Sequence, residues 1–317
     1  ALAGSGLMLA FILRRLLYTV PILLGISLIV FLLFHVAGGN PVYHMLGKNA
    51  SPEEILRLTR QLGLDRPLWL QYLHYIGNLL RGEFGRSWET RQRIGAMLSS
   101  GLGPSLCLAL PAFIATTALA LAVAMASVLS KGKSLDRGLV FASVLGMSIS
   151  ILALIIGAQF LLAYRLDLFP ISGFETGWRG IPYLALPALI WIANQVGGDV
   201  RYYRSVLLEE MGREYVVTAR AKGLSRARAL RVHVLGNAMI PITTRLVMEI
   251  PLLFTGSLLL ENFFGIPGLG NMSVNALNAS DFPVIEAVTL FGSALYILAN
   301  LIGDVLYAVF DPRVKLA

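Results

Sequence analysis

Long apolar runs alternate with polar segments along most of the chain. Six runs have about the 20 residues that a helix needs to cross the hydrocarbon core of a bilayer. They lie at residues 11–36, 105–129, 138–164, 182–200, 241–262 and 284–310. The pattern predicts an all-α, polytopic membrane protein with six transmembrane helices.

The basic residues between these runs predict its orientation, because Lys and Arg are enriched in cytoplasmic loops. With the amino terminus in the cytoplasm, the residues on that side are Arg14, Arg15, Lys131, Lys133, Arg137, eight between Arg201 and Arg231, Arg313 and Lys315. The short loops on the opposite side contain only Arg165 and Arg179. We therefore expect a multi-pass membrane protein with both termini in the cytoplasm.

The runs also predict how the chain is organised. Residues 1–7 are small and precede Met8, as in a tag or linker remnant. The predicted parts that follow are a first transmembrane helix at 8–37, a periplasmic helical segment at 38–104, a transmembrane core at 105–310 with a cytoplasmic loop at 201–240, and a cytoplasmic tail at 311–317. The first apolar run is too long for the core of a cleavable signal peptide.

The long outer segment predicts two helices. Ser51 precedes Pro52, Glu53 and Glu54, which is typical of a helix start, and Gly63 marks its end. A second helix follows from apolar residues at three- and four-residue spacing, namely Trp69, Tyr72, Leu73, Ile76 and Leu80. We expect these helices to form a small cap on the periplasmic face, at or within the membrane interface.

The cytoplasmic loop is too polar to span a membrane, yet it has the signals of ordered structure. Residues Glu214 to Ala221 favour a helix, Gly223 is suited to end it, and Ser225 can cap a second helix. Two short helices at this point would present a basic surface to a partner. The alternative is an ordinary basic loop beside anionic lipid.

Composition supports a membrane protein and excludes several other classes. Apolar residues make up 56% of the chain and charged residues 14%, and mean hydropathy is +0.71. In a chain this apolar, we interpret the net charge of +8 as a signal for orientation in the membrane and not for nucleic-acid binding. The single cysteine, Cys107, allows no intrachain disulfide. The four histidines have no metal-binding spacing. The sequence also lacks the glycine-lysine loop of an ATPase, and no paired catalytic constellation indicates an intramembrane enzyme.

The loop resembles the coupling-loop signature of binding-protein-dependent ABC permeases of the dipeptide, oligopeptide and nickel group. The matching residues are Glu214, Tyr215, Thr218, Ala219, Arg220, Ala221, Lys222, Gly223, Leu224, His233, Asn237, Ala238 and Pro241. Further matches lie in the outer segment, at Gly82 to Ser87, at Glu261 to Gly270, at Asp281 to Val284 and near the end. Three residues differ from those that the family usually has at these positions. They are Asn40, just after the first span, and Ser150 and Leu152, within the third span.

The resemblance implies the fold and partners of a type I importer. The partners would be a second homologous permease, two cytoplasmic ATPase subunits and a periplasmic peptide-binding protein, within membrane lipid and with no nucleic acid. This chain would bind no cofactor, because ATP and Mg would sit on the ATPase subunits. Peptides are the expected cargo, with glutathione or nickel chelates as alternatives from the same family. An independent channel or secondary carrier is the alternative from another class.

Polar residues within the spans are candidates for the transport pathway, since such groups usually face a bundle interior or a cavity. Asn194 and Gln195 lie well inside the fourth span and are the predicted contacts for a peptide backbone. Glu249 is a third candidate, although it can instead pair with Arg245 one turn earlier. Asp199 lies near an inner end, where we expect it to pair with a loop arginine.

Overall fold

The computed structural model describes residues 2–37, 42, 51–61, 63–255 and 257–310. Within these residues the secondary structure is helical, apart from an isolated bridge between Arg86 and Arg93. The predicted all-α fold class is confirmed. Asn40 and the tail at 311–317 lie outside the described residues.

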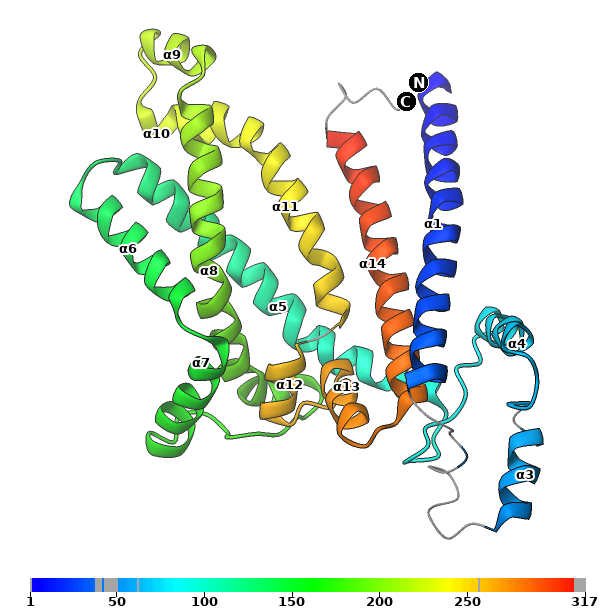
Figure 1. Ribbon diagram of the computed structural model, residues 1–317. Helices are drawn as coiled ribbons and strands as arrows, with labels where there is room; N and C mark the ends of the chain where they lie inside the picture. The colour runs from blue at the N-terminus through cyan, green and yellow to red at the C-terminus, as the bar shows by residue number, and fades with distance from the viewer. Residues whose placement is uncertain (1, 38–41, 43–50, 62, 256, 311–317) are drawn as a thin grey trace.

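Long helices form the body of the molecule (Figure 1). They are α1 (Leu2–Ala37), α5 (Ile94–Leu129), α8 (Ile181–Met211), α11 (Leu235–Thr255) and α14 (Phe282–Phe310). Helix α5 packs along α8, and α14 packs along both α1 and α11. Among the described residues, α1, α5 and α14 are each long and apolar enough to cross a membrane unaided. Helices α8 and α11 carry charged and amide side chains and do not meet that test alone.

The predicted third span is broken, so the expectation of one continuous helix over 138–164 was wrong. Helix α6 (Ser134–Ser148) is bent by 91° relative to the helical segment Ile151–Arg165, which begins with α7 (Ile151–Ala158). Ile149 and Ser150 between them have extended backbone angles, with ψ of 127° and 138°. A π-helical turn, Gln159–Arg165, follows α7. Together α6 and α7 would make a fourth, bent span.

Other helix ends also differ from the predicted boundaries. Helix α1 includes the residues from Leu2 onward that we expected to be a linker. Helix α5 begins at Ile94, inside the expected outer segment, because Ile94 and Leu98 are buried against Leu269. The predicted span 241–262 divides between α11 and the separate helix α12 (Leu258–Phe264), whose start is capped by the Ser257 hydroxyl.

The outer segment contains the two predicted helices, α3 (Pro52–Gln61) and α4 (Leu68–Leu80). The Ser51 hydroxyl accepts a hydrogen bond from the Glu54 backbone N–H at 3.3 Å, and the Ser51 N–H donates to the Glu54 carboxylate at 3.0 Å. These reciprocal bonds form a capping box. Gly63 follows α3 at a φ of 67°, as expected of a residue that ends a helix.

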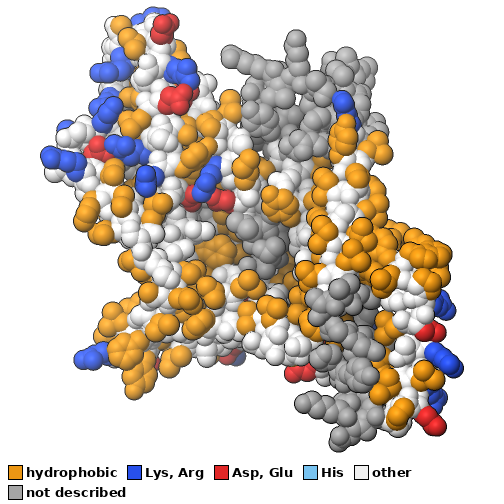
Figure 2. All heavy atoms as spheres, viewed as in Figure 1, with side chains coloured by type: hydrophobic (Ala, Val, Ile, Leu, Met, Phe, Trp, Pro, Cys, Tyr) orange, Lys and Arg blue, Asp and Glu red, His pale blue; other side chains and the backbone are white. Residues whose placement is uncertain are grey.

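The two ends of the molecule differ in character. The start of α1 and the end of α14 lie at the same end as α9 (Glu214–Ala221) and α10 (Arg226–Ala229). Helices α7, α12 and α13 (Leu269–Asn278) lie at the other end. Figure 2 shows Lys and Arg side chains gathered over α9, α10 and the adjoining parts of α6 and α8. This arrangement puts the basic loop on the same side as the start of α1 and the end of α14.

Two pairs of helices pack closely at a glycine. A Cβ on Gly197 of α8 would collide with the backbone oxygen of Ser143 in α6, and one on Gly303 of α14 would collide with Val247 of α11. Small residues of this kind let helices pack closely in a membrane, where there is little hydrophobic force between them. These glycines therefore set the separation of α8 from α6 and of α14 from α11.

Candidate functional site

The predicted coupling loop forms as a helix, a tight turn and a second short helix. Helix α9 spans Glu214–Ala221, as predicted, and the chain turns at Gly223, whose φ is 92°. The Gly223 N–H donates to the Arg220 carbonyl at 2.9 Å, and the Leu224 N–H donates to the Ala219 carbonyl at 3.3 Å. A positive φ favours glycine, which explains its place in this turn.

Helix α10 continues into the membrane core without a linker. The Ser225 hydroxyl caps α10 by accepting from the Arg228 N–H at 3.4 Å. A π-helical turn, Leu230–Val234, then joins α10 to α11. A displacement of α10 would therefore act directly on a long helix of the bundle.

Most of the predicted site residues are available to a partner. The exposed residues are Glu214, Tyr215, Thr218, Arg220, Ala221, Lys222 and Gly223, and Ala219 is half-buried. Val216 is the exception on α9, since it is 1% exposed. Helix α9 thus presents a mostly polar and basic outer surface and is anchored by the buried Val216.

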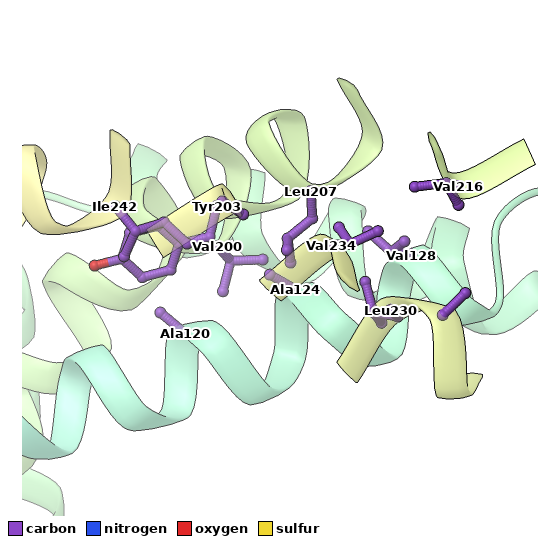
Figure 3. Close-up of a cluster of buried hydrophobic side chains, with 12 residues drawn as sticks. Ala120, Ala124, Val128, Val200, Tyr203, Leu207, Val216, Leu230, Val234 and Ile242 are labelled. Atoms are coloured by element: carbon purple, nitrogen blue, oxygen red, sulfur yellow. The ribbon is translucent and has the colours of Figure 1, made fainter. Parts of the chain in front are cut away.

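That anchor belongs to a buried cluster to which α5, α8, α9, α10, the π-helical turn before α11, and α11 itself all contribute (Figure 3). The same cluster contains Val128 of α5, Leu207 of α8 and Val234 of the turn before α11. A hydrogen bond from the Arg226 guanidinium to the Val128 carbonyl, at 2.8 Å, adds a polar link between α10 and the end of α5. The loop is therefore packed onto the bundle and is not a tether.

Polar contacts hold the start of α9 against the end of α8. The Tyr215 hydroxyl donates to the Glu210 carboxylate at 2.6 Å. Partial burial, followed by this hydrogen bond, raises the pKa of the Tyr215 hydroxyl. Arg213 pairs with Glu209 at 2.9 Å and with Glu210 at 3.6 Å. These contacts fix the angle at which α9 leaves the membrane helix.

A second polar cluster near this end was not predicted from the sequence. Asp136 of α6 pairs with Arg204 of α8 at 3.0 Å and accepts the Gly132 N–H at 3.0 Å. Arg204 also donates to the Ser127 hydroxyl of α5 at 2.8 Å. Asp136 and Ser127 are buried. The cluster joins α5, α6 and α8 just below the coupling loop.

Candidate pathway residues meet where α8 lies against α11. Arg245 of α11 pairs with Asp199 of α8 at 3.3 Å and with Glu249 at 2.9 Å. Its guanidinium also lies over the Tyr202 ring, 5.4 Å from the centroid. The pairing of Glu249 with Arg245 is confirmed, whereas the expected partner of Asp199, a loop arginine, was wrong.

The two amides do not join this charged cluster. Asn194 is half-buried and Gln195 is exposed, and both lie on α8. Gln195 precedes Asp199 by one helical turn, so these two side chains share a face of α8. The role of Asn194 and Gln195 in contacting a peptide stays a prediction.

Residues of the outer motifs build the opposite end of the molecule. The buried Glu261 carboxylate accepts the N–H groups of Gly270 at 2.7 Å and Asn271 at 3.2 Å, and so caps the start of α13. These bonds replace the water that its oxygens would otherwise bind. Asp281 accepts bonds from the Ser87 hydroxyl and, at 3.0 Å, the Trp88 N–H. These motif residues therefore hold the fold together.

In the described part of the chain, no group of three or more His, Cys, Asp or Glu residues could hold a metal ion.

Comparison with known proteins gives the same picture over nearly the whole chain. The model of the binding-protein-dependent transport system inner membrane component matches residues 94–316, and the model of the amino-terminal part of such components matches residues 8–98. The dipeptide transport system permease protein DppB of Escherichia coli is 33% identical over 97% of this chain and 99% of its own length. The oligopeptide transport system permease protein AppB of Bacillus subtilis is also 33% identical, over 97% of this chain and all of its own (100%).

A third relative extends the range of named cargoes. The glutathione transport system permease protein GsiC of Salmonella choleraesuis is 34% identical over 97% of this chain and 99% of its own length. The model that matches residues 94–316 covers the segment that forms α9, Gly223 and α10. The chain is a membrane protein that belongs to the family of binding-protein-dependent transport system inner membrane components.

Proposed function

We propose that this chain is the permease subunit of an ATP-driven importer that moves peptides across the bacterial inner membrane. The observation that carries the proposal is the exposed α9 surface, which is anchored through Val216 to helices α5, α8 and α11. A partner that holds this surface and moves would shift the ends of three long helices together. Such rigid-body motion is how transporters alternate between two openings.

The moving partner in this proposal is a pair of cytoplasmic ATPase subunits, which bind ATP and Mg. This chain binds neither, and it acts as a non-catalytic subunit. Its docking residues are Glu214, Tyr215, Thr218, Ala219, Arg220, Ala221, Lys222 and Gly223. The basic side chains gathered at the same end as the start of α1 and the end of α14 support a cytoplasmic location for both termini (Figure 2).

The remaining partners follow from the family. A second homologous permease would complete the transport pathway, and a periplasmic peptide-binding protein would deliver cargo to the end that carries α12 and α13. The relatives named for dipeptides, oligopeptides and glutathione support a peptide cargo. Nickel chelates are the further alternative from the sequence resemblance.

We assign the cargo pathway to the face of α8 and α11 that carries Asn194, Gln195 and Glu249. The ion pair of Arg245 with Asp199 joins these two helices at that level, and Glu249 pairs with the same arginine within α11. Opening the pathway would require α8 and α11 to change their spacing. The shared arginine would then keep one carboxylate partner as the helices move.

Reconstitution tests the proposal against an independent channel or secondary carrier. The purified complex, in proteoliposomes with its binding protein outside, should take up labelled peptide only when ATP is enclosed with the ATPase subunits. A proton or sodium gradient without ATP should drive no uptake. Uptake by the chain alone under an ion gradient would contradict the proposal and support a secondary carrier.

A further inference from the structure

Helix α4 combines an apolar composition with an unusual position beside a membrane span. Residues Leu68–Leu80 include no Asp, Glu, Lys or Arg, whereas the preceding helix α3 carries Glu53, Glu54, Arg57 and Arg60. The two helices are thus neighbours in sequence with opposite affinities for water. This contrast indicates that they occupy different surroundings.

One face of α4 is fixed to α1 by aromatic residues. The Tyr72 hydroxyl donates to the Leu24 carbonyl at 3.1 Å and lies 2.9 Å from the Ser27 hydroxyl. The Phe31 ring contacts the rings of Tyr72 and Tyr75 at centroid distances of 5.3 Å and 5.6 Å. Phe31 is 1% exposed, so the contact is closely packed.

The depth of that contact places α4 at the level of the membrane. The apolar window of α1 ends at Phe34, and Ser27 lies seven residues before it, or about 10 Å along the helix. Interfacial helices bury their apolar faces about 5–10 Å into the boundary between headgroups and acyl chains. Figure 1 shows α4 nearly end-on beside the lower part of the upright α1, so its axis runs across that of the span.

The face of α4 away from these contacts is apolar and uncovered. Trp69 is 62% exposed, Leu73 58% and Leu80 85%. They recur at spacings of four and seven residues and therefore lie on one side of the helix. Figure 2 shows hydrophobic side chains over α4 next to those of α1, with charged side chains over α3.

We propose that α4 is a membrane-interface helix whose Trp69, Leu73 and Leu80 face lies in the lipid leaflet at the α12 and α13 end of the molecule. The bilayer is the occupant because α4 meets α1 inside its apolar window and continues its apolar surface. Tyr72 then ties the interface helix to the span, while α3 remains in water. The proposal requires only that α1 crosses the bilayer, and so it is independent of the cargo and of ATP coupling.

Spin labels at matched positions test this placement. The full chain, with any co-purifying subunits retained, is placed in lipid nanodiscs after the exposed Cys107 has been replaced by serine. Labels are attached at Leu73→Cys on α4 and, as the control, at the exposed Arg57→Cys on α3. Collision rates with oxygen, which concentrates in lipid, and with a water-soluble nickel chelate are then compared.

The ratio of oxygen to nickel collisions should be several times higher at Leu73 than at Arg57. Leu80→Cys provides a second α4 position if the Leu73 variant does not fold, and it should give the same high ratio. Equal ratios on α3 and α4 would overturn the proposal in favour of a water-exposed helix. Low collision rates with both reagents at Leu73 and Leu80 would overturn it in favour of a protein partner that covers this face.

Discussion

A single guanidinium, that of Arg245, holds carboxylates on two neighbouring helices. Asp199 is 4% exposed, so its charge depends on this one ion pair within the described structure, and Glu249 is only partly buried. Removing one partner of a buried ion pair destabilises the fold far more than removing one partner of an exposed pair, because the remaining buried charge is left without compensation. The two sides of this cluster should therefore respond differently to substitution.

Arg245→Gln should lower the free energy of unfolding by about 2 kcal/mol, a value reduced from that of a fully buried pair because the arginine is itself 43% exposed. Glu249→Gln, the matched control, should cost less than about 1 kcal/mol, because Arg245 keeps its bond to Asp199. Thermal unfolding of both variants in nanodiscs measures the difference. A larger loss for Glu249→Gln would show that Asp199 is not the carboxylate that depends on Arg245.

For single residues, contacts with nearby backbone groups could be predicted from the sequence, whereas side-chain pairs between distant segments could not. Ser51, Gly223 and Ser225 act on backbone groups within four residues, and each has its predicted role. Asp136 and Arg204 are 68 residues apart and meet only because α6 packs on α8. No spacing rule links them, so their ion pair could not be predicted from the sequence.

The break between α6 and α7 is the main departure at the scale of whole elements. Hydropathy alone predicted one span over 138–164, because the apolar run continues through Ile149 and Ser150 without a charge. The backbone instead extends at both residues and turns by 91°. A hydropathy pattern reports the lipid or protein surroundings of a segment and not its direction, so it could not indicate this bend.

The backbone at this break should accept proline at one position. Ser150 has a φ of −61°, and Ile149 before it is extended, as a residue preceding proline must be. Ser150→Pro should therefore leave stability unchanged or raise it by about 0.5 kcal/mol, through a less flexible unfolded chain. The thermal midpoint in nanodiscs measures the effect.

Ile149→Pro is the matched control for that variant. Its preceding residue, Ser148, is helical, and proline disfavours that conformation. The free energy of unfolding of this control variant should fall by about 1–3 kcal/mol. If Ser150→Pro were destabilised as strongly as Ile149→Pro, the extended backbone assigned to the break would be wrong.

For the whole molecule, the order of spans and loops was predictable because each depends on hydropathy and charge along the chain. Local helix signals predicted the two short helices of the cytoplasmic loop, and α9 has the predicted ends, whereas the coupling role of this loop was implied only by the family resemblance. What required the structure was the anchor under it, a cluster that brings Val128, Leu207, Val216 and Val234 together from distant segments. That cluster packs α9 against the long helices of the bundle.

We propose that movement of the ATPase subunits reaches the membrane helices through the turn at Gly223. Gly223 has a φ of 92°, and no neighbouring atom lies within 4 Å of the position that a Cβ would take, so a substitution there strains the backbone without any clash. Gly223→Val should cost about 1–3 kcal/mol locally and remove the bend between α9 and α10. Glu214→Ala should give a milder defect, since it removes one charge and leaves the backbone unchanged.

Gly236→Val is the matched control, because Gly236 also has open space around it but lies in α11 without a positive φ. The decisive measurement is ATP-driven peptide uptake by reconstituted complexes, recorded beside ATP turnover and the amount of ATPase subunit retained. Gly223→Val should insert normally yet lose ATPase retention or stimulated turnover, together with uptake, while Gly236→Val keeps all three. Full assembly, stimulated turnover and uptake in Gly223→Val would contradict the account and leave the loop as a passive basic segment.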